Sequence, residues 1–249
     1  MKKREQEEHV LELTKPLLEK LYGRFSVDSD QKDKPDAAIT VHKPHKRFGR
    51  NASPFRVGIE ITTVDKAQDL AYLNDKKHGR DEIIAQTIDA LENGIDSGMP
   101  IKKTTIEIAD SFIYDGAIPK KDKYQSYVES GAYREIILLC FSDLVETESP
   151  LFKEQLQGWT NHLLSKTQFP FDAVVFVNLR RGNPVRVYKK RDPLLAAPAQ
   201  SRHSGSTVTV FQGPTMRVGQ QYNLKEIMSN DPLIAPRQPK GAPKSKSGA

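Results

Sequence analysis

Apolar residues recur at three- and four-residue spacing near the start of the chain. This spacing predicts an amphipathic helix over about residues 5–25. Pro16 falls inside it and predicts either a kink or a break near Thr14. Gly23 marks a plausible end of the helix, and the polar stretch 26–35 is expected to be a loop. The apolar stripe consists of Val10, Leu13, Leu17 and Leu21.

Two stretches then alternate as β-strands do, one over 36–41 and a clearer one over 55–64. In the second, Val57, Ile59 and Ile61 fall on one face, so Glu60 and Thr62 share the opposite face. The basic connector 42–51 joins the two strands, which indicates a hairpin. Its register does not follow from the pattern.

The rest of the chain alternates between helical and strand patterns. The continuous apolar run 172–179 is typical of a central strand, and the turn at 180–184 predicts a hairpin with 185–189. Within 124–146, mostly helical or one long apolar segment, periodicity does not separate a helix from a buried strand over Ile136–Phe141. Further helices are expected at 81–93 and 151–166, and a short helix or structured connector at 65–74. Further strands are expected at 104–109, 207–211 and 216–218, and a loop at 192–206.

This order predicts an α/β fold, with a mixed β-sheet flanked by helices and C-terminal hairpin additions. We expect one domain over 1–231, followed by a disordered basic tail over 232–249. The chain has 249 residues, is 37% hydrophobic and carries a formal charge of +6. Four of those excess charges lie in the tail, which contains no acid. Charge therefore favours nucleic acid as a partner only weakly.

Several classes of protein are excluded or disfavoured by what the sequence lacks. No apolar run reaches the roughly 18 residues of a membrane span, and no apolar segment of a signal peptide follows the first residues. Cys140 is the single cysteine and is expected to be a buried structural thiol. There is no G-x-x-x-x-G-K-[ST] loop, G-x-S-x-G elbow or C-x-x-C pair. A cytoplasmic protein without a membrane partner is expected.

One pair of acids carries a chemical hypothesis. Pro35-Asp36 opens the first strand, and Glu60-Ile61-Thr62 lies on the next. Together with the preceding helix, this arrangement resembles the PD-(D/E)XK nuclease superfamily over roughly residues 5–110. The resemblance implies a restriction-endonuclease-like core and phosphodiester hydrolysis assisted by Mg²⁺ or Mn²⁺. Mg²⁺ prefers hard oxygen ligands and often takes only one or two carboxylates.

The resemblance also assigns roles and exposes a departure. Asp36 and Glu60 are the expected metal ligands, with a further acid from the first helix, for which Glu19 or Glu12 would serve. The family places a lysine two residues beyond the second acid, where this chain has Thr62. Some relatives carry that lysine on the following helix. Lys66, Lys76 and Lys77 are the candidates for it.

Less specific interpretations stand beside each of these residues. Pro-Asp also begins ordinary turns, and a glutamate on a half-exposed strand is usually solvated. His42 and His45 have the H-x-x-H spacing of a metal site but no evident third ligand. Basic residues near two turns are either solvated or contact a nucleic-acid backbone. They are Lys43, Lys46, Arg47, Arg180 and Arg181.

Three functions follow as alternatives. The first is a metal-dependent nuclease acting on DNA or RNA, with Asp36, Glu60, Thr62 and Lys66 in the catalytic site. The second is a catalytically inert nuclease-like fold that binds nucleic acid or a protein partner, which Thr62 favours. The third is a protein-interaction module of a toxin, defence or mobile-element system. A homodimer is compatible with any of them.

Overall fold

The structure is a computed structural model, and it describes residues 3–29, 31, 34–49, 52–66, 102–131 and 133–212. The chain divides into two units, Met1–Lys66 with Glu107–Ser206, and Ala67–Ile106 with Thr207–Ala249. The elements expected at 81–93 and 216–218 and the tail lie outside the described residues. So does most of the element expected at 65–74, and the expectation of one domain over 1–231 stays a prediction.

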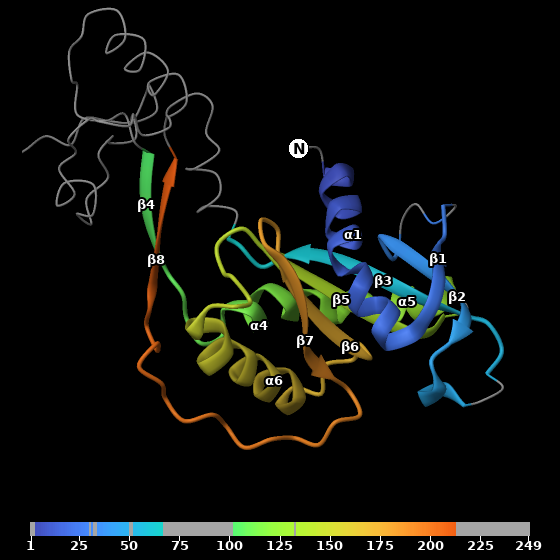
Figure 1. Ribbon diagram of the computed structural model, residues 1–249. Helices are drawn as coiled ribbons and strands as arrows, with labels where there is room; N and C mark the ends of the chain where they lie inside the picture. The colour runs from blue at the N-terminus through green and yellow to red at the C-terminus, as the bar shows by residue number, and fades with distance from the viewer. Residues whose placement is uncertain are drawn as a thin grey trace, which may run out of the picture. The chain divides into compact units, whose positions relative to one another are not determined.

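The first unit contains a six-stranded mixed sheet with helices, so the expected mixed α/β class is confirmed (Figure 1). Strands β4 and β8 form a separate two-stranded sheet. The elements are α1 (Lys3–Tyr22), β1 (Gly23–Val27), β2 (Ala37–Pro44), η1 (Lys46–Phe48), β3 (Phe55–Thr63), β4 (Lys102–Glu107), α4 (Phe112–Ala117), η3 (Ile118–Lys123), α5 (Tyr124–Ser130), β5 (Tyr133–Ser142), η4 (Phe152–Leu156), α6 (Gln157–Lys166), β6 (Ala173–Asn178), β7 (Gly182–Lys189) and β8 (Thr207–Gln212).

The large sheet has the strand order β1-β2-β3-β5-β6-β7. Strands β1, β2 and β3 pair antiparallel, whereas β3, β5 and β6 run parallel. The last strand, β7, returns antiparallel to β6. Both expected hairpins, β2–β3 and β6–β7, are therefore confirmed. The parallel centre explains the continuous apolar runs of β5 and β6, because such strands are buried on both faces.

Helix α1 covers one face of the sheet (Figure 1). Its Val10 and Leu18 are completely buried against Ile59 of β3 and Ile137 of β5. Burying a side chain of this size contributes about 1.5–3 kcal/mol. The opposite face packs against the other helices, where Phe152 stacks on Phe176 of β6 with ring centroids 5.4 Å apart.

The N-terminal helix differs from expectation in two ways. It runs through Pro16 without a break, so the break near Thr14 is wrong. Proline removes one backbone hydrogen bond, but the burial of Leu11 and Leu18 on either side keeps the helix on the sheet. The helix ends before Gly23, as expected, yet strand β1 follows at once where a loop was expected from residue 26. This short edge strand is mostly exposed, so its sequence lacks the alternation of apolar and polar residues that predicts a strand.

The ambiguous segment 124–146 contains both structures. It begins as α5, breaks at Gly131 and continues as β5. Cys140 is fully buried within β5, which confirms a structural thiol. Burial raises the pKa of this thiol, so its reactive thiolate form is suppressed. Among the described residues, no helix combines the length and apolar character needed to cross a membrane.

Candidate functional site

Asp36 and Glu60 are brought to neighbouring positions by the β2–β3 pairing. The register matches Ala37 with Ile59, so the next pair outward is Asp36 and Glu60. Asp36 directly precedes β2. Its carboxylate oxygen Oδ2 accepts a hydrogen bond from the Ile61 N–H at 2.8 Å, which continues the pairing of β2 with β3 through a side chain. The two acids predicted from sequence thus lie together, held by the backbone of adjacent strands.

The turn before Asp36 is fixed by side-chain contacts. Gln31 donates from Nε2 to the Pro35 carbonyl at 3.0 Å, and Tyr133 donates from its hydroxyl to Gln31 at 2.9 Å. Gly58 lies beneath this turn, where a Cβ would meet Pro35 Cγ at 3.1 Å and the Tyr133 ring at 3.2 Å. A glycine here lets the turn close tightly onto β3.

Glu60 lies on the face of β3 opposite α1 and is only 3% exposed. Its Oε1 accepts a hydrogen bond from Lys120 Nζ at 2.6 Å, which is also an ion pair. Tyr127 hydrogen-bonds to the same carboxylate. Burial is the largest influence on Glu60 and raises its pKa, the hydrogen bond from Lys120 opposes this, and the nearby charge of Asp36 raises the pKa again.

Lys120 reaches Glu60 from η3, which directly follows α4. The approach of α4 depends on Gly116, because a Cβ there would lie 2.5 Å from the Val64 Cα at the end of β3. Backbone can come this close only without a side chain. Sequence reasoning missed Lys120. Its signal was weak, namely a lysine after Pro119 in a stretch that reads only as lysine-rich.

Thr62 and Lys66 lie beside this ion pair rather than in it. Both line a cavity of about 360 Å³ that also reaches Lys120 and Asp115. The Thr62 hydroxyl donates to the backbone carbonyl of Thr63 at 3.3 Å. Lys66 is exposed and makes no ion pair within the described part of the chain. Lys120, and not Lys66, therefore supplies the positive charge at Glu60; Lys76 and Lys77 lie outside the described residues.

The acids that α1 brings near Asp36 are Glu7 and Glu8. They line a cavity of about 460 Å³ together with Asp36 and Ile61. Glu19 is exposed and lies 12 residues beyond Glu7, about 18 Å along the helix at a rise of 1.5 Å per residue. Glu19 is thus separated from Asp36.

The metal-binding potential of this region rests on two carboxylates. Within the ranges that the structure describes, no group of three or more His, Cys, Asp or Glu side chains is arranged to hold a metal ion. Asp36 and Glu60 alone match the one or two carboxylates with which Mg²⁺ is commonly bound. His42 contacts Ser26 at 2.7 Å, and His45 accepts from the Arg47 N–H at 3.2 Å.

The basic residues expected to contact nucleic acid fall in two places. Lys43 and Lys46 are exposed at the end of β2 and in η1, whereas Arg47 pairs with Glu135 at 3.6 Å. At the β6–β7 turn, both arginines are paired with acids. Arg181 lies 3.1 Å from Glu146, and Arg180 lies 4.0 Å from Asp143.

Comparison of the chain with protein-family models, with curated proteins and with solved structures finds no match.

Proposed function

We propose that this protein is a metal-dependent nuclease that hydrolyses phosphodiester bonds in DNA or RNA. The observation that carries the proposal is the 2.6 Å contact between Lys120 Nζ and Glu60 Oε1. It puts a cation next to Glu60, the second acid of the Asp36–Glu60 pair. The resembled nucleases have a lysine two residues beyond this acid, where this chain has the uncharged Thr62. We also propose that the α1–β1–β2–β3 order with β5 in parallel is a restriction-endonuclease-like core.

The residues of the chain have distinct roles in this proposal. Asp36 and Glu60 would hold Mg²⁺ or Mn²⁺, which when bound polarises the phosphate and lowers the pKa of an attacking water. Lys120 and Tyr127 stabilise the ionised form of Glu60 against its burial and against the charge of Asp36. The Lys120 ammonium lines the cavity shared with Thr62, where negative charge on the phosphate would develop.

A second function is favoured by a specific observation. Glu60 is almost completely covered, and one of its oxygens is already engaged by Lys120. An ion pair closed in this way also fits an inert nuclease-like fold that binds nucleic acid or a protein partner in a defence or mobile-element system.

Cleavage assays on plasmid DNA, single-stranded DNA and RNA, with Mg²⁺ or Mn²⁺ and with EDTA, test the proposal. We expect Asp36→Asn and Lys120→Met each to reduce the cleavage rate about 10²–10³-fold. Lys121→Met is the matched control, because among the described residues the exposed Lys121 ammonium pairs with no acid and hydrogen-bonds to the Thr167 carbonyl at 3.3 Å. It should cleave like the wild type.

A rescue variant tests why Lys120 matters. Thr62→Lys introduced into Lys120→Met should restore much of the activity if a cation in this cavity is what the reaction needs. Asp36→Asn cleaving at the wild-type rate would disprove the site. Nucleic-acid binding in EDTA without any metal-dependent cleavage by the wild type would instead support the inert fold.

A further inference from the structure

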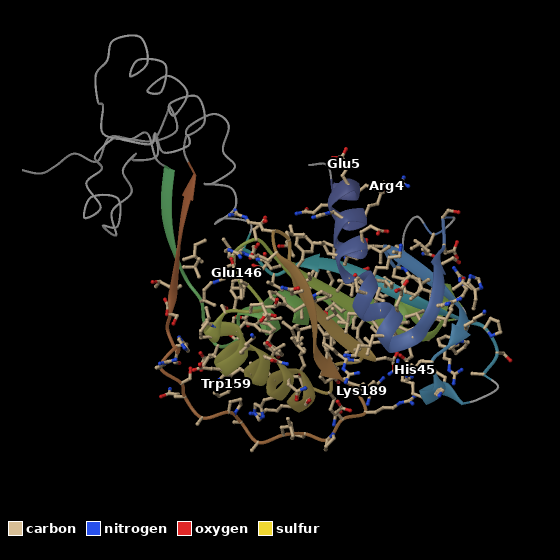
Figure 2. The ribbon with its side chains drawn as sticks, in the orientation of Figure 1. Arg4, Glu5, His45, Glu146, Trp159 and Lys189 are labelled. Atoms are coloured by element: carbon tan, nitrogen blue, oxygen red, sulfur yellow. The ribbon has the colours of Figure 1, made fainter. Side chains whose placement is uncertain are left out.

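A second charged cavity lies at the C-terminal end of α1, where Leu21 and Tyr22 line it. It measures about 300 Å³ and is lined by five cationic side chains and two acidic ones. Figure 2 shows Lys189 of this cavity at the opposite end of α1 from Arg4, which lines the cavity of Asp36. The cationic residues are Arg47, Arg134, Arg186, Lys189 and Arg191.

Both acids of this cavity already accept hydrogen bonds from the protein. Glu135 accepts a hydrogen bond from the Tyr22 hydroxyl at 2.8 Å and pairs with Arg47 at 3.6 Å. Asp172 accepts the Ile136 N–H at 2.8 Å, which extends the backbone ladder at the start of β5. Two acids against five cations leave an excess of three positive charges facing one small space.

Three of the cations have no acidic partner within the part of the chain that the structure describes. Arg134, Arg186 and Arg191 form no ion pair with any residue that the structure describes, whereas Lys189 pairs with Asp192 at 2.8 Å. In contrast, Arg180 and Arg181 on the same chain both have one. Arg134 and Arg191 are exposed, so water solvates them in the free protein, and an entering anion would meet guanidinium groups that no acid within the described residues already occupies.

Aromatic rings hold two of the guanidinium groups by their faces. Arg134 lies over Phe48 and Phe55, 5.0 and 4.8 Å from the ring centroids. Arg47 lies over Phe48 and Tyr22, at 4.3 and 5.0 Å. A guanidinium stacked by its face keeps its N–H groups directed outward in the plane, ready for bidentate contact with an oxyanion.

We propose that this cavity is a binding site for a phosphate group. A phosphate monoester carries up to two negative charges and several acceptor oxygens, which match an arginine-rich site with three uncompensated charges. The chemistry fits the terminal phosphate of a nucleic-acid strand and the phosphate of a small metabolite equally. The proposal does not depend on cleavage at Asp36 and Glu60, since this cavity shares no lining residue with the cavities around that pair.

Calorimetric titration of the full chain with inorganic phosphate and pyrophosphate, at constant ionic strength against chloride, tests the site. We expect both to bind, and Arg186→Gln to weaken binding about 10–100-fold, as expected for the loss of a charge-assisted hydrogen bond. Arg202→Gln is the matched control and should bind within about two-fold of wild type, because that arginine is exposed, pairs with Glu154 at 3.5 Å and lies outside the cavity. Arg186→Lys keeps the charge without the fork, so intermediate binding is expected.

Two oligonucleotides distinguish the source of the phosphate. A 5′-phosphorylated strand that binds more tightly than its unphosphorylated twin, and is displaced by pyrophosphate, identifies a strand end. Binding of the free anions alone identifies a small phosphorylated ligand. The proposal fails if neither anion binds above the chloride control, or if Arg202→Gln weakens binding as much as Arg186→Gln. Unchanged circular dichroism and melting temperature verify that each variant is folded.

Discussion

The regions around Glu60 and Glu135 carry charge in opposite ways. Around Glu60, a nearly buried carboxylate is matched by one cation, Lys120, and the pair is largely withdrawn from solvent. Around Glu135, cationic side chains outnumber acidic ones, and Arg134 and Arg186 have no acidic partner among the described residues. The first arrangement holds its charges in a closed pair. The second leaves charge available for a ligand.

This difference indicates which ionic interactions contribute to the stability of the fold. A closed pair is sensitive to the loss of the partner of its more buried member, here Glu60 at 4% side-chain exposure against 18% for Lys120, because the remaining charge is costly in a poorly solvated place. An open cluster of like charges loses little when one member is removed, because water solvates the rest. Stability measurements should therefore separate the two regions even before any ligand or substrate is known.

The largest expected effect comes from the same substitution made in both regions. Lys120→Met should lower the free energy of unfolding by about 3 kcal/mol, since it leaves Glu60 ionised and buried. Lys189→Met should change it by less than about 1 kcal/mol, because that lysine is 34% exposed and pairs with a 42% exposed aspartate. Urea unfolding at neutral pH measures both. Equal losses would contradict the distinction, and adding Glu60→Gln to Lys120→Met should recover most of the loss.

A smaller effect, with a definite pH dependence, is expected for Glu60→Gln alone. The folded protein raises the Glu60 pKa above its ordinary value of 4.5, so ionisation of this group reduces stability as pH rises through the folded pKa. Glutamine does not ionise. The variant should therefore be more stable than wild type at neutral pH by about 0.5–2 kcal/mol.

That advantage should shrink as pH falls below the ordinary pKa, where the wild-type side chain is protonated in both states. Thermal unfolding between pH 4 and 7 measures the trend. An advantage that grows toward acid pH, or a variant clearly less stable at pH 7, would mean that the Lys120 ion pair outweighs the cost of burial.

The smallest effect is expected where the basic cavity touches the core. Tyr22→Phe removes the hydroxyl that donates to Glu135 at 2.8 Å and should cost about 1 kcal/mol. Tyr133→Phe is the control in a neutral pair, since its hydroxyl donates to the Gln31 amide oxygen. A loss for Tyr22→Phe as large as that for Lys120→Met would show that the cavity acids are held as tightly as Glu60.

Local pattern was enough to predict much of the sheet. The alternation around Ile59 and the apolar run around Val175 identified β3 and β6, because in both strands the burial of each face shows directly in the hydrophobicity of consecutive residues. The polar edge strand β1 was missed for the opposite reason, since it is specified by backbone pairing with β2 rather than by burial.

The residues of the candidate site also fall into those that the sequence predicts and those that it does not. Asp36 and Glu60 were found from sequence because a hairpin brings them together across a short connection. Lys120 was not, because the contact with Glu60 joins residues 60 positions apart and depends on how α4 packs on β3. Glu7 and Glu8 were passed over in favour of Glu19, since helical spacing shows which residues share a face but not which turn of the helix lies beside Asp36.

Gly116 has a bearing on how this protein would respond to random mutation. It contributes no side chain to any site, yet it is the point where α4 touches the backbone of Val64 and so sets how far Lys120 can reach. Any larger residue there would push the helix off the strand while leaving every charged group in the sequence intact. A screen for loss of function would therefore return substitutions of Gly116 together with those of Asp36 and Glu60. The Gly116 variants would lose activity because the helix is displaced, although glycine has no reactive group of its own.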